Sequence, residues 1–532
     1  MGITTLPVFK QWVPKWLISV TIFLVLLPGL LLFGLSTASG PGAAGYYGIE
    51  PVDVQYSMIV FYAAVASFFA LERRFFVFIA TKEYYILSLI IQIFTAYVCF
   101  HTHNFYILLI FRFLQGMANC MSTSICITLI FSRLHSERAR EIGYSIFYCL
   151  LLCISPVSSM ITAPILDVYD FNVLYKFIIY AFIPGGVLLL VLMNNVRLNR
   201  KMPLYQLDWG SFVVYAAALC LLGYALVYGQ QYYWLEDRRI VLSLSGAILL
   251  IILHLVRQHH LRRPYLSVDV FRHRNFNLGV FLIFILYMIR GTLGLVSVYF
   301  AATLGMDPIH IAWILLANVA GVILSVLVSS RLIIMKRPMR LVWIYGFLLL
   351  LVFHIWMWFL FSTQADPSTF VIPLMIQGAG AGMLMTPIIV FTISSVPANL
   401  GSTASATGVF FRFLGFCSSI SFINYFELNH KNAYVNRFQE SLSMLNTAVT
   451  DRLALYNRAL TGRGMAPDQA VKVARGLLNR SVESQAQLRA MMDYYTFISV
   501  ILVIVVLVIA LFPKVSRTRI NLKSNQPSPA SY

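Results

Sequence analysis

The chain has 532 residues, of which 59% are hydrophobic and only 11% are charged, and its mean hydropathy is +0.79. Soluble globular proteins average about 25% charged residues, so this composition excludes a set of soluble domains and predicts an all-α polytopic membrane protein. The net charge of +19 does not indicate nucleic-acid binding, because the positive side chains fall in short segments between apolar runs.

Taken in chain order, the apolar runs predict fourteen transmembrane helices. Each run is long enough to cross roughly 30 Å of hydrocarbon as a helix, which satisfies its own backbone hydrogen bonds there. The predicted spans are 16–39, 53–71, 84–101, 105–132, 142–166, 174–194, 210–229, 239–256, 276–304, 311–330, 341–362, 370–396, 403–427 and 494–512.

The even number of spans places both termini on the same side of the membrane. Most Lys and Arg residues outside the spans fall in segments on that side, whereas the short loops on the other side hold only Arg238 and Arg239. Because positive residues in short loops stay in the cytoplasm, we predict that both termini are cytoplasmic. The long polar segment 428–493 is then external.

Two of the predicted spans have similar sequences. The fourth contains FLQGMANCM and the twelfth contains MIQGAGAGM, so Gln115-Gly116 matches Gln377-Gly378. This match predicts two related six-helix halves, residues 1–196 and 258–532, with two helices inserted at 197–257. Parallel repeats of this kind are a common plan of transporters, with the substrate bound at the interface of the halves.

Polar side chains inside the spans are the first candidate functional residues. Arg112, Gln115 and Asn119 recur at helical spacing in the fourth span, so they share a face that looks inward. We predict that they border the path of a substrate or of protons. The alternative is a structural clamp on neighbouring helices. Gln377, the matching residue of the twelfth span, is assigned to the same path.

Two further arginines lie deep within spans. Arg412, in the thirteenth span, has the same two interpretations as Arg112. Arg290 lies near the centre of the ninth span, where a cation costs several kcal/mol unless it faces protein or water. Either a carboxylate on another helix or an anionic substrate must neutralise it. Because few acidic residues lie deep in the spans, the sequence favours the substrate.

Proton coupling requires a group that gains and loses a proton on alternate sides of the membrane. Partly buried Asp and Glu side chains are the usual carriers, and the candidates here are Asp53, Asp167 and Glu427. The group Glu72-Arg73-Arg74, after the second span, predicts a cytoplasmic gate instead. In this interpretation the three side chains form an ionic latch that holds one conformation.

The segment 428–493 is polar, is rich in Ala, Leu, Arg and Gln, and predicts two or more amphipathic helices. It either caps the external mouth of the protein or provides a docking surface for a partner.

These sequence features together resemble the major facilitator superfamily, specifically its fourteen-span drug:proton antiporters of the EmrB/QacA type. The resemblance covers essentially the whole chain. It rests on four segments: RFLQG at 112–116, IQGAGAGMLMTP at 376–387, GVFFRFLGF with Arg412 and Gly415, and the long helical segment before the last span.

The resemblance implies a major facilitator fold and a secondary active efflux transporter. Its members export lipophilic small molecules against proton entry, and the deep arginines of this chain add acidic molecules to the expected substrates. It also implies a bacterial cytoplasmic membrane, with 428–493 meeting a periplasmic membrane-fusion adaptor that continues to an outer-membrane channel. We expect a transporter and not an enzyme, with no cofactor and no metal.

The chain also departs from the pattern of the family. The family loop Gly-x-Leu-x-Asp-Arg-x-Gly-Arg is reduced to Glu72-Arg73-Arg74, and VLLPGLLL, with Pro28, replaces the first-span Asp of many relatives. The antiporter motif of the fifth span survives only as APILDV. A second hypothesis therefore stays open: a dedicated exporter of one endogenous metabolite or lipid, with weak or no proton coupling.

Overall fold

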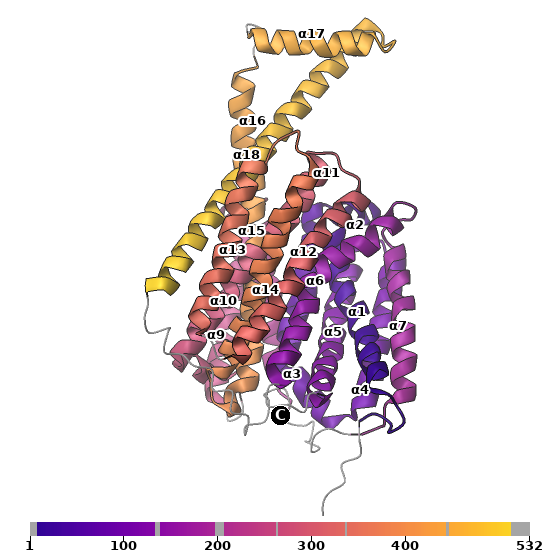
Figure 1. Cartoon of the computed structure of the whole chain (residues 1–532), viewed down its shortest axis with the longest axis vertical. Helices are drawn as coiled ribbons and strands as arrows, with labels where there is room; N and C mark the ends of the chain where they lie inside the picture. The colour runs from indigo at the N-terminus through magenta and orange to yellow at the C-terminus, as the bar shows by residue number, and fades with distance from the viewer. Residues whose placement is uncertain are drawn as a thin grey trace, which may run out of the picture.

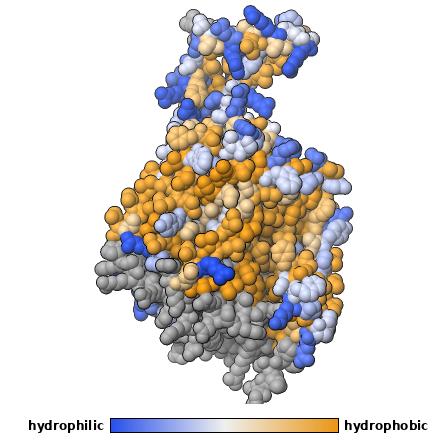
Figure 2. Space-filling model, viewed as in Figure 1, coloured by the Kyte–Doolittle hydropathy of each residue, from blue (hydrophilic) through white to orange (hydrophobic). Residues whose placement is uncertain are grey.

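The computed structural model describes residues 8–133, 139–196, 207–261, 264–335, 338–442 and 446–511. Within these ranges, fourteen helical segments are long and apolar enough to cross a membrane, the number that the hydropathy pattern predicts. They lie side by side in one bundle (Figure 1). Exposed apolar side chains form a broad hydrophobic band on the bundle surface (Figure 2), as expected of helices that face lipid.

The first half provides six of these helices and a short connecting helix, α2. Helix α3 packs along α5, and α4 packs against both α5 and α7. The bounds are α1 (Lys15–Ala38), α2 (Gly40–Tyr47), α3 (Pro51–Phe78), α4 (Thr81–His101), α5 (Phe105–Arg133), α6 (Ala139–Leu166) and α7 (Val173–Leu192).

The second half repeats this arrangement. Helix α12 packs along α14, and α13 packs against both α14 and α18. The bounds are α10 (Arg274–Arg290), α11 (Thr292–Ala302), α12 (Pro308–Ile334), α13 (Met339–Leu360), α14 (Val371–Ser394), α15 (Gly401–Tyr425) and α18 (Pro467–Leu511).

The glycines of the Gln-Gly repeat occupy equivalent places in the two halves. A Cβ atom at Gly116 on α5 would collide with the carbonyl oxygen of Phe61 on α3. A Cβ atom at Gly378 on α14 would likewise collide with the carbonyl oxygen of Asn318 on α12. Each glycine therefore allows the fourth helix of its half to pack directly on the backbone of the second helix.

The inserted pair consists of α8 (Trp209–Tyr228) and α9 (Arg238–His260). Helix α8 contacts α3 of the first half and α15 of the second. The two inserted helices are joined at one end by an ion pair, with 2.9 Å between Asp208 and Arg257. Helix α9 continues to His260, beyond the predicted boundary at residue 257.

The ninth predicted span, 276–304, is not one continuous helix. Helix α10 ends at Arg290 and α11 begins at Thr292, on the two sides of Gly291. Gly291 packs against Ser419 on α15, where an added Cβ atom would collide with the Ser419 hydroxyl. The break therefore lies at the contact between α15 and the ninth span, directly after Arg290.

Within the described residues, the long segment 428–493 is mostly helical, as its composition predicts, and projects from one end of the bundle (Figure 1). Helix α15 continues through a π-helical turn (Phe426–His430) into α16 (Lys431–Glu440), and α17 (Thr447–Thr461) follows. Helix α18 has 45 residues, about twice the number needed to cross the hydrocarbon. Residues 494–511 of the predicted span 494–512 form only its final part. We call α16, α17 and the projecting part of α18 the arm.

Asp493 on α18 connects this helix to the start of α16, at the place where the arm meets the bundle. Its Oδ2 atom lies 2.8 Å from Nδ1 of His430 and accepts a hydrogen bond of 3.0 Å from the Tyr434 hydroxyl. These contacts join the start of α16 to α18 where the two helices leave the bundle. Below, the arm side is the end of the bundle that carries the arm, and the opposite side is the end where α1 begins.

Candidate functional site

A cavity of about 1540 Å³ lies between the two halves. Helices α1, α3, α5 and α6 line it from the first half, and α10, α11, α12, α14 and α15 line it from the second. The lining extends from Asp167 and Asp307 on the arm side to Glu72 and Tyr265 near the opposite side. This volume exceeds the roughly 300–1,000 Å³ of typical small-molecule pockets.

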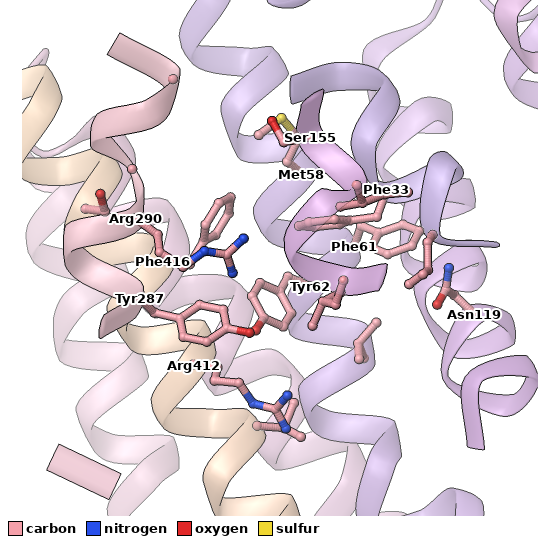
Figure 3. A pocket seen from close by; sticks show the side chains of 18 of the residues that line it. Phe33, Met58, Phe61, Tyr62, Asn119, Ser155, Tyr287, Arg290, Arg412 and Phe416 are labelled. Atoms are coloured by element: carbon pink, nitrogen blue, oxygen red, sulfur yellow. The ribbon is translucent and has the colours of Figure 1, made fainter. Parts of the chain in front are cut away.

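Aromatic side chains from both halves meet in the middle of this cavity (Figure 3). The ring of Phe33 on α1 lies 5.6 Å from that of Phe61 and 6.1 Å from that of Phe416 on α15. Tyr62 on α3 lies 5.6 Å from Phe416. We call Phe33, Phe61, Tyr62 and Phe416 the aromatic wall. Its flat apolar faces suit a lipophilic ligand.

Arg412 projects into the cavity from α15 and is held by neutral groups. Its Nε atom donates to the carbonyl oxygen of Gly408 at 3.3 Å, and Nη1 donates to the hydroxyl of Tyr148 on α6 at 3.3 Å. The guanidinium group also lies 5.6 Å from the centre of the Tyr148 ring. Because α6 belongs to the first half, these contacts cross the interface between the halves.

Arg290 lines the same cavity from the end of α10. Its guanidinium group lies 5.3 Å from the centre of the Tyr287 ring, one helical turn earlier. The rings of Tyr62 and Tyr287 lie between the two guanidinium groups (Figure 3), and Tyr62 interacts electrostatically with both. In the described part of the chain, no carboxylate forms an ion pair with Arg290 or Arg412.

Of the three polar residues predicted on the inward face of the fourth span, only Asn119 lines the cavity. Arg112 is 2% exposed, donates to the carbonyl oxygen of Leu32 on α1 at 3.2 Å, and lies over the ring of Tyr175 on α7. Gln115 is buried beside it. Asn119 itself donates to the carbonyl oxygen of Gly29 on α1. These contacts hold α5 against α1.

Gln377 lies away from the cavity lining, in the contact between α14 and α12. Its Oε1 atom accepts a hydrogen bond from the Asn318 side chain, which also donates to the carbonyl oxygen of Leu374 at 3.0 Å. The repeat therefore pairs Gln377 with Gln115 in burial as well as in sequence. Neither side chain reaches the cavity.

The three predicted proton carriers lie in two different environments. Asp167 and Glu427 line the arm side of the cavity, on the turn after α6 and on the turn after α15. Asp53 is instead part of the N-terminal cap of α3, where its carboxylate accepts from the Glu50 backbone N–H at 3.0 Å and from the Tyr228 hydroxyl. The cavity therefore brings together two of the three candidates.

The predicted cytoplasmic gate falls within the last turns of α3 instead of in a loop. Glu72 is 3% exposed and lies at the cavity wall, next to Tyr84 on α4 and Cys120 on α5. The side chains of Arg73 and Arg74 lie outside the part of the chain that the structure describes. The ionic latch therefore remains a prediction from the sequence.

Several aromatic residues line the site although no sequence motif identifies them. Phe33, Tyr62 and Tyr287 line the cavity from the first, second and ninth spans. Tyr148 on α6 and Phe416 on α15 line it from the fifth and thirteenth spans. With 40 Phe and 29 Tyr residues in the chain, only the packing of the helices distinguishes lining rings from lipid-facing ones.

Comparisons with known proteins agree with this architecture. Probable multidrug resistance protein EmrY of Escherichia coli strain K12 is 21% identical over 405 residues, 75% of this chain and 77% of EmrY. Colistin resistance protein EmrB of Acinetobacter baumannii is 21% identical over 434 residues, 80% of this chain and 82% of that protein.

A solved structure of a POT family transporter in complex with 5-aminolevulinic acid matches 97% of this chain and 100% of that chain. Its TM-score is 0.61 at 13% identity, a similarity that shows the fold alone. The sequence model of the Major Facilitator Superfamily matches residues 17–420. With fourteen helices among its described residues that are long and apolar enough to cross a membrane, arranged in two halves around a central cavity, the chain belongs to the Major Facilitator Superfamily and is a membrane transporter of small molecules, not an enzyme.

Proposed function

We propose that this transporter exports lipophilic small molecules, acidic ones among them, from the cytoplasm by proton antiport and alternating access. The observation that carries the proposal is the cavity of about 1540 Å³, whose aromatic wall comes from both halves. A ligand bound there contacts both halves at once, so movement of one half against the other exposes it to alternate sides. Relatives named for multidrug resistance support export as the direction.

Proton coupling, in this proposal, uses the carboxyl groups of Asp167 and Glu427. Both line the cavity that the substrate occupies, so protonation and substrate binding influence each other through the same space. Asp53 contributes to the cap of α3 and to the contact with Tyr228 on α8. It is the least suited of the three candidates, because these contacts hold its carboxylate in place.

One observation favours the second hypothesis, a dedicated exporter of one metabolite or lipid with weak or no coupling. Within the described lining, the residues that α1 contributes are Leu30 and Phe33, and both are apolar. The first span therefore offers no proton carrier to the cavity where many relatives are expected to have one.

Liposomes that contain the purified protein distinguish the two hypotheses. An imposed pH gradient is combined with a panel of lipophilic acids, cations and neutral compounds, and internal pH is recorded after each addition. Substrate-dependent proton flux establishes antiport. Substrate movement without proton flux rejects antiport and leaves the dedicated exporter.

We further propose a bacterial cytoplasmic membrane, with both termini in the cytoplasm and the arm in the periplasm, where a membrane-fusion adaptor binds it and leads to an outer-membrane channel. The arm exposes apolar side chains outside the bundle, among them Leu455 on α17 and Leu477 on α18. Leu455→Asp should reduce export from cells and leave transport in liposomes unchanged. Equal loss in both assays would exclude an adaptor surface at Leu455.

A further inference from the structure

We infer that the cavity has an anion subsite at Arg290, to which Arg412 adds a second positive charge, and that this subsite binds a compact monoanionic group attached to a flat apolar body. The anionic group is a carboxylate or sulfonate in this inference, and the apolar body lies on the aromatic wall. The inference rests on the proposed function, because it assigns the chemical class of the exported substrate. The inference also names the residues that select this class of substrate.

Charge is the first step of the argument. Both guanidinium groups line a cavity inside the membrane-spanning bundle, where an arginine without a counter-charge costs several kcal/mol. Among the described residues, the carboxylates on the arm side of the cavity, Asp167, Asp307 and Glu427, make no ion pair with either arginine. Asp307 is paired with His310 instead. The centre of the cavity thus has two positive charges and favours an anion.

The contacts of the two arginines are the second step. Arg412 has hydrogen bonds to Gly408 and Tyr148, which orient its guanidinium plane. Arg290 contacts the face of the Tyr287 ring, and within the described residues no hydrogen bond engages its N–H groups. A guanidinium group offers five N–H donors in a fork that matches a carboxylate or sulfonate. Arg290 therefore has N–H donors available for a ligand. Arg412, whose guanidinium group is held in place, contributes a second positive charge to the same cavity.

The shape of the surroundings is the third step. The rings of Tyr62 and Tyr287 lie between the two arginines (Figure 3), and Tyr62 also belongs to the aromatic wall. A ligand whose charged group lies at these tyrosines therefore places its apolar part on Phe33 and Phe416. This arrangement selects amphipathic anions over small inorganic ones, because the wall offers dispersion contacts that a bare ion cannot use.

The test measures binding and needs no transport. Purified protein in nanodiscs of neutral phosphatidylcholine is titrated calorimetrically with 1-naphthoate, its neutral analogue 1-naphthamide and the cation 1-naphthylmethylammonium. The carboxylate should bind at least about tenfold more tightly than the amide, because charge-assisted hydrogen bonds are roughly twice as strong as neutral ones. The cation should bind most weakly. Equal affinity for the carboxylate and the amide would overturn the subsite.

Variants of the two arginines show whether these residues bind the anion or only support the fold. Arg290→Gln and Arg412→Gln should each remove the preference for the carboxylate and leave the affinity for the amide nearly unchanged. Arg290→Lys should keep a weaker preference, because it keeps the charge but loses the fork. The matched control is Arg452→Gln, since Arg452 also lies over a tyrosine ring, 5.1 Å from the centre of Tyr456, but on the arm. A carboxylate preference that survives both glutamine variants would reject the inference.

An anionic lipid headgroup has the same chemistry as a soluble anion. A second experiment distinguishes the two. Phosphatidylglycerol is added to the nanodiscs while 1-naphthoate binding is measured. Unchanged binding assigns the subsite to a soluble amphipathic anion, whereas competition would overturn that assignment in favour of a lipid. Failure of the proposed antiport appears only in the liposome proton-flux assay, so the two failures are distinguishable.

Discussion

Nη1 of Arg412 on α15 donates a hydrogen bond of 3.3 Å to the hydroxyl of Tyr148 on α6, across the interface between the two halves. The same guanidinium group lies over the Tyr148 ring. This contact belongs to one arrangement of the halves and must break or change when they rearrange. It therefore connects a side chain of the cavity wall to the conformational state of the transporter.

Tyr148→Phe should lower the equilibrium ratio of the present arrangement to the alternative one by roughly fivefold, because one hydrogen bond contributes about 1 kcal/mol and the ring contact remains. Spin labels, one on each half, report the arrangement as a distance distribution. The control is Tyr345→Phe, since Tyr345 is 57% exposed on α13. A distribution identical to that of the unsubstituted protein would show that the hydroxyl does not stabilise this state.

Gly116→Ala and Gly378→Ala should each destabilise the protein by about 2–4 kcal/mol, since the new Cβ would collide with a backbone oxygen of the packed helix. Thermal unfolding in detergent, followed by size-exclusion chromatography, measures the loss. Gly476→Ala on α18 is the matched control, because no heavy atom lies within 4 Å of the place that its Cβ would take. That variant should be neutral or slightly stabilised, because alanine favours a helix over glycine by about 1 kcal/mol.

Asp208 and Arg257 should make the stability of the inserted pair depend on pH. Burial opposes ionisation of Asp208, but hydrogen bonds from Ser211 and Arg257 outweigh it and lower the pKa of Asp208 below its usual value. A carboxylate with a lowered folded-state pKa stabilises the fold above its unfolded-state pKa of about 3.9 and loses that effect as pH falls.

Asp208→Asn should therefore lower the unfolding temperature at pH 7 by an amount equivalent to about 1 kcal/mol or less, because Arg257 is half exposed. The difference from the unsubstituted protein should shrink as pH falls below about 4. Asp208→Ala should cost more, about 1–2 kcal/mol, because it also removes the N-terminal cap of α8. A difference between the Asp208→Asn variant and the unsubstituted protein that is constant with pH would contradict the ion-pair explanation.

Glu427→Gln and Asp167→Asn should reduce substrate-dependent proton flux in liposomes if the cavity carboxyls carry the protons. The flux should fall to the level of protein-free liposomes for whichever residue is the carrier, and downhill substrate movement should persist. Asp53→Asn should preserve the flux and lower thermal stability instead, because its carboxylate caps α3. Loss of flux only in the Asp53 variant would reverse this assignment.

The class of the protein and the number of its spans follow from the sequence alone. Apolar runs of sufficient length leave a helix as the conformation that satisfies the backbone in lipid, so hydropathy predicts fourteen spans and the described part of the chain has fourteen. The Gln-Gly repeat predicts two halves, and Gly116 and Gly378 occupy equivalent helix contacts. Local composition suffices for these features because each is a property of one helix or of one repeated segment.

The lining of the cavity was decided only by the tertiary structure. Arg112 and Arg412 are both arginines deep in spans, yet Arg112 is fully enclosed between α1 and α7 whereas Arg412 faces the cavity. Asp53 and Asp167 likewise fall near similar span ends, but only Asp167 lines the cavity. The direction of each side chain depends on the rotation and tilt of its helix, and packing against neighbouring helices sets both. Hydropathy reports how deep a residue lies in the membrane, not which neighbour it faces.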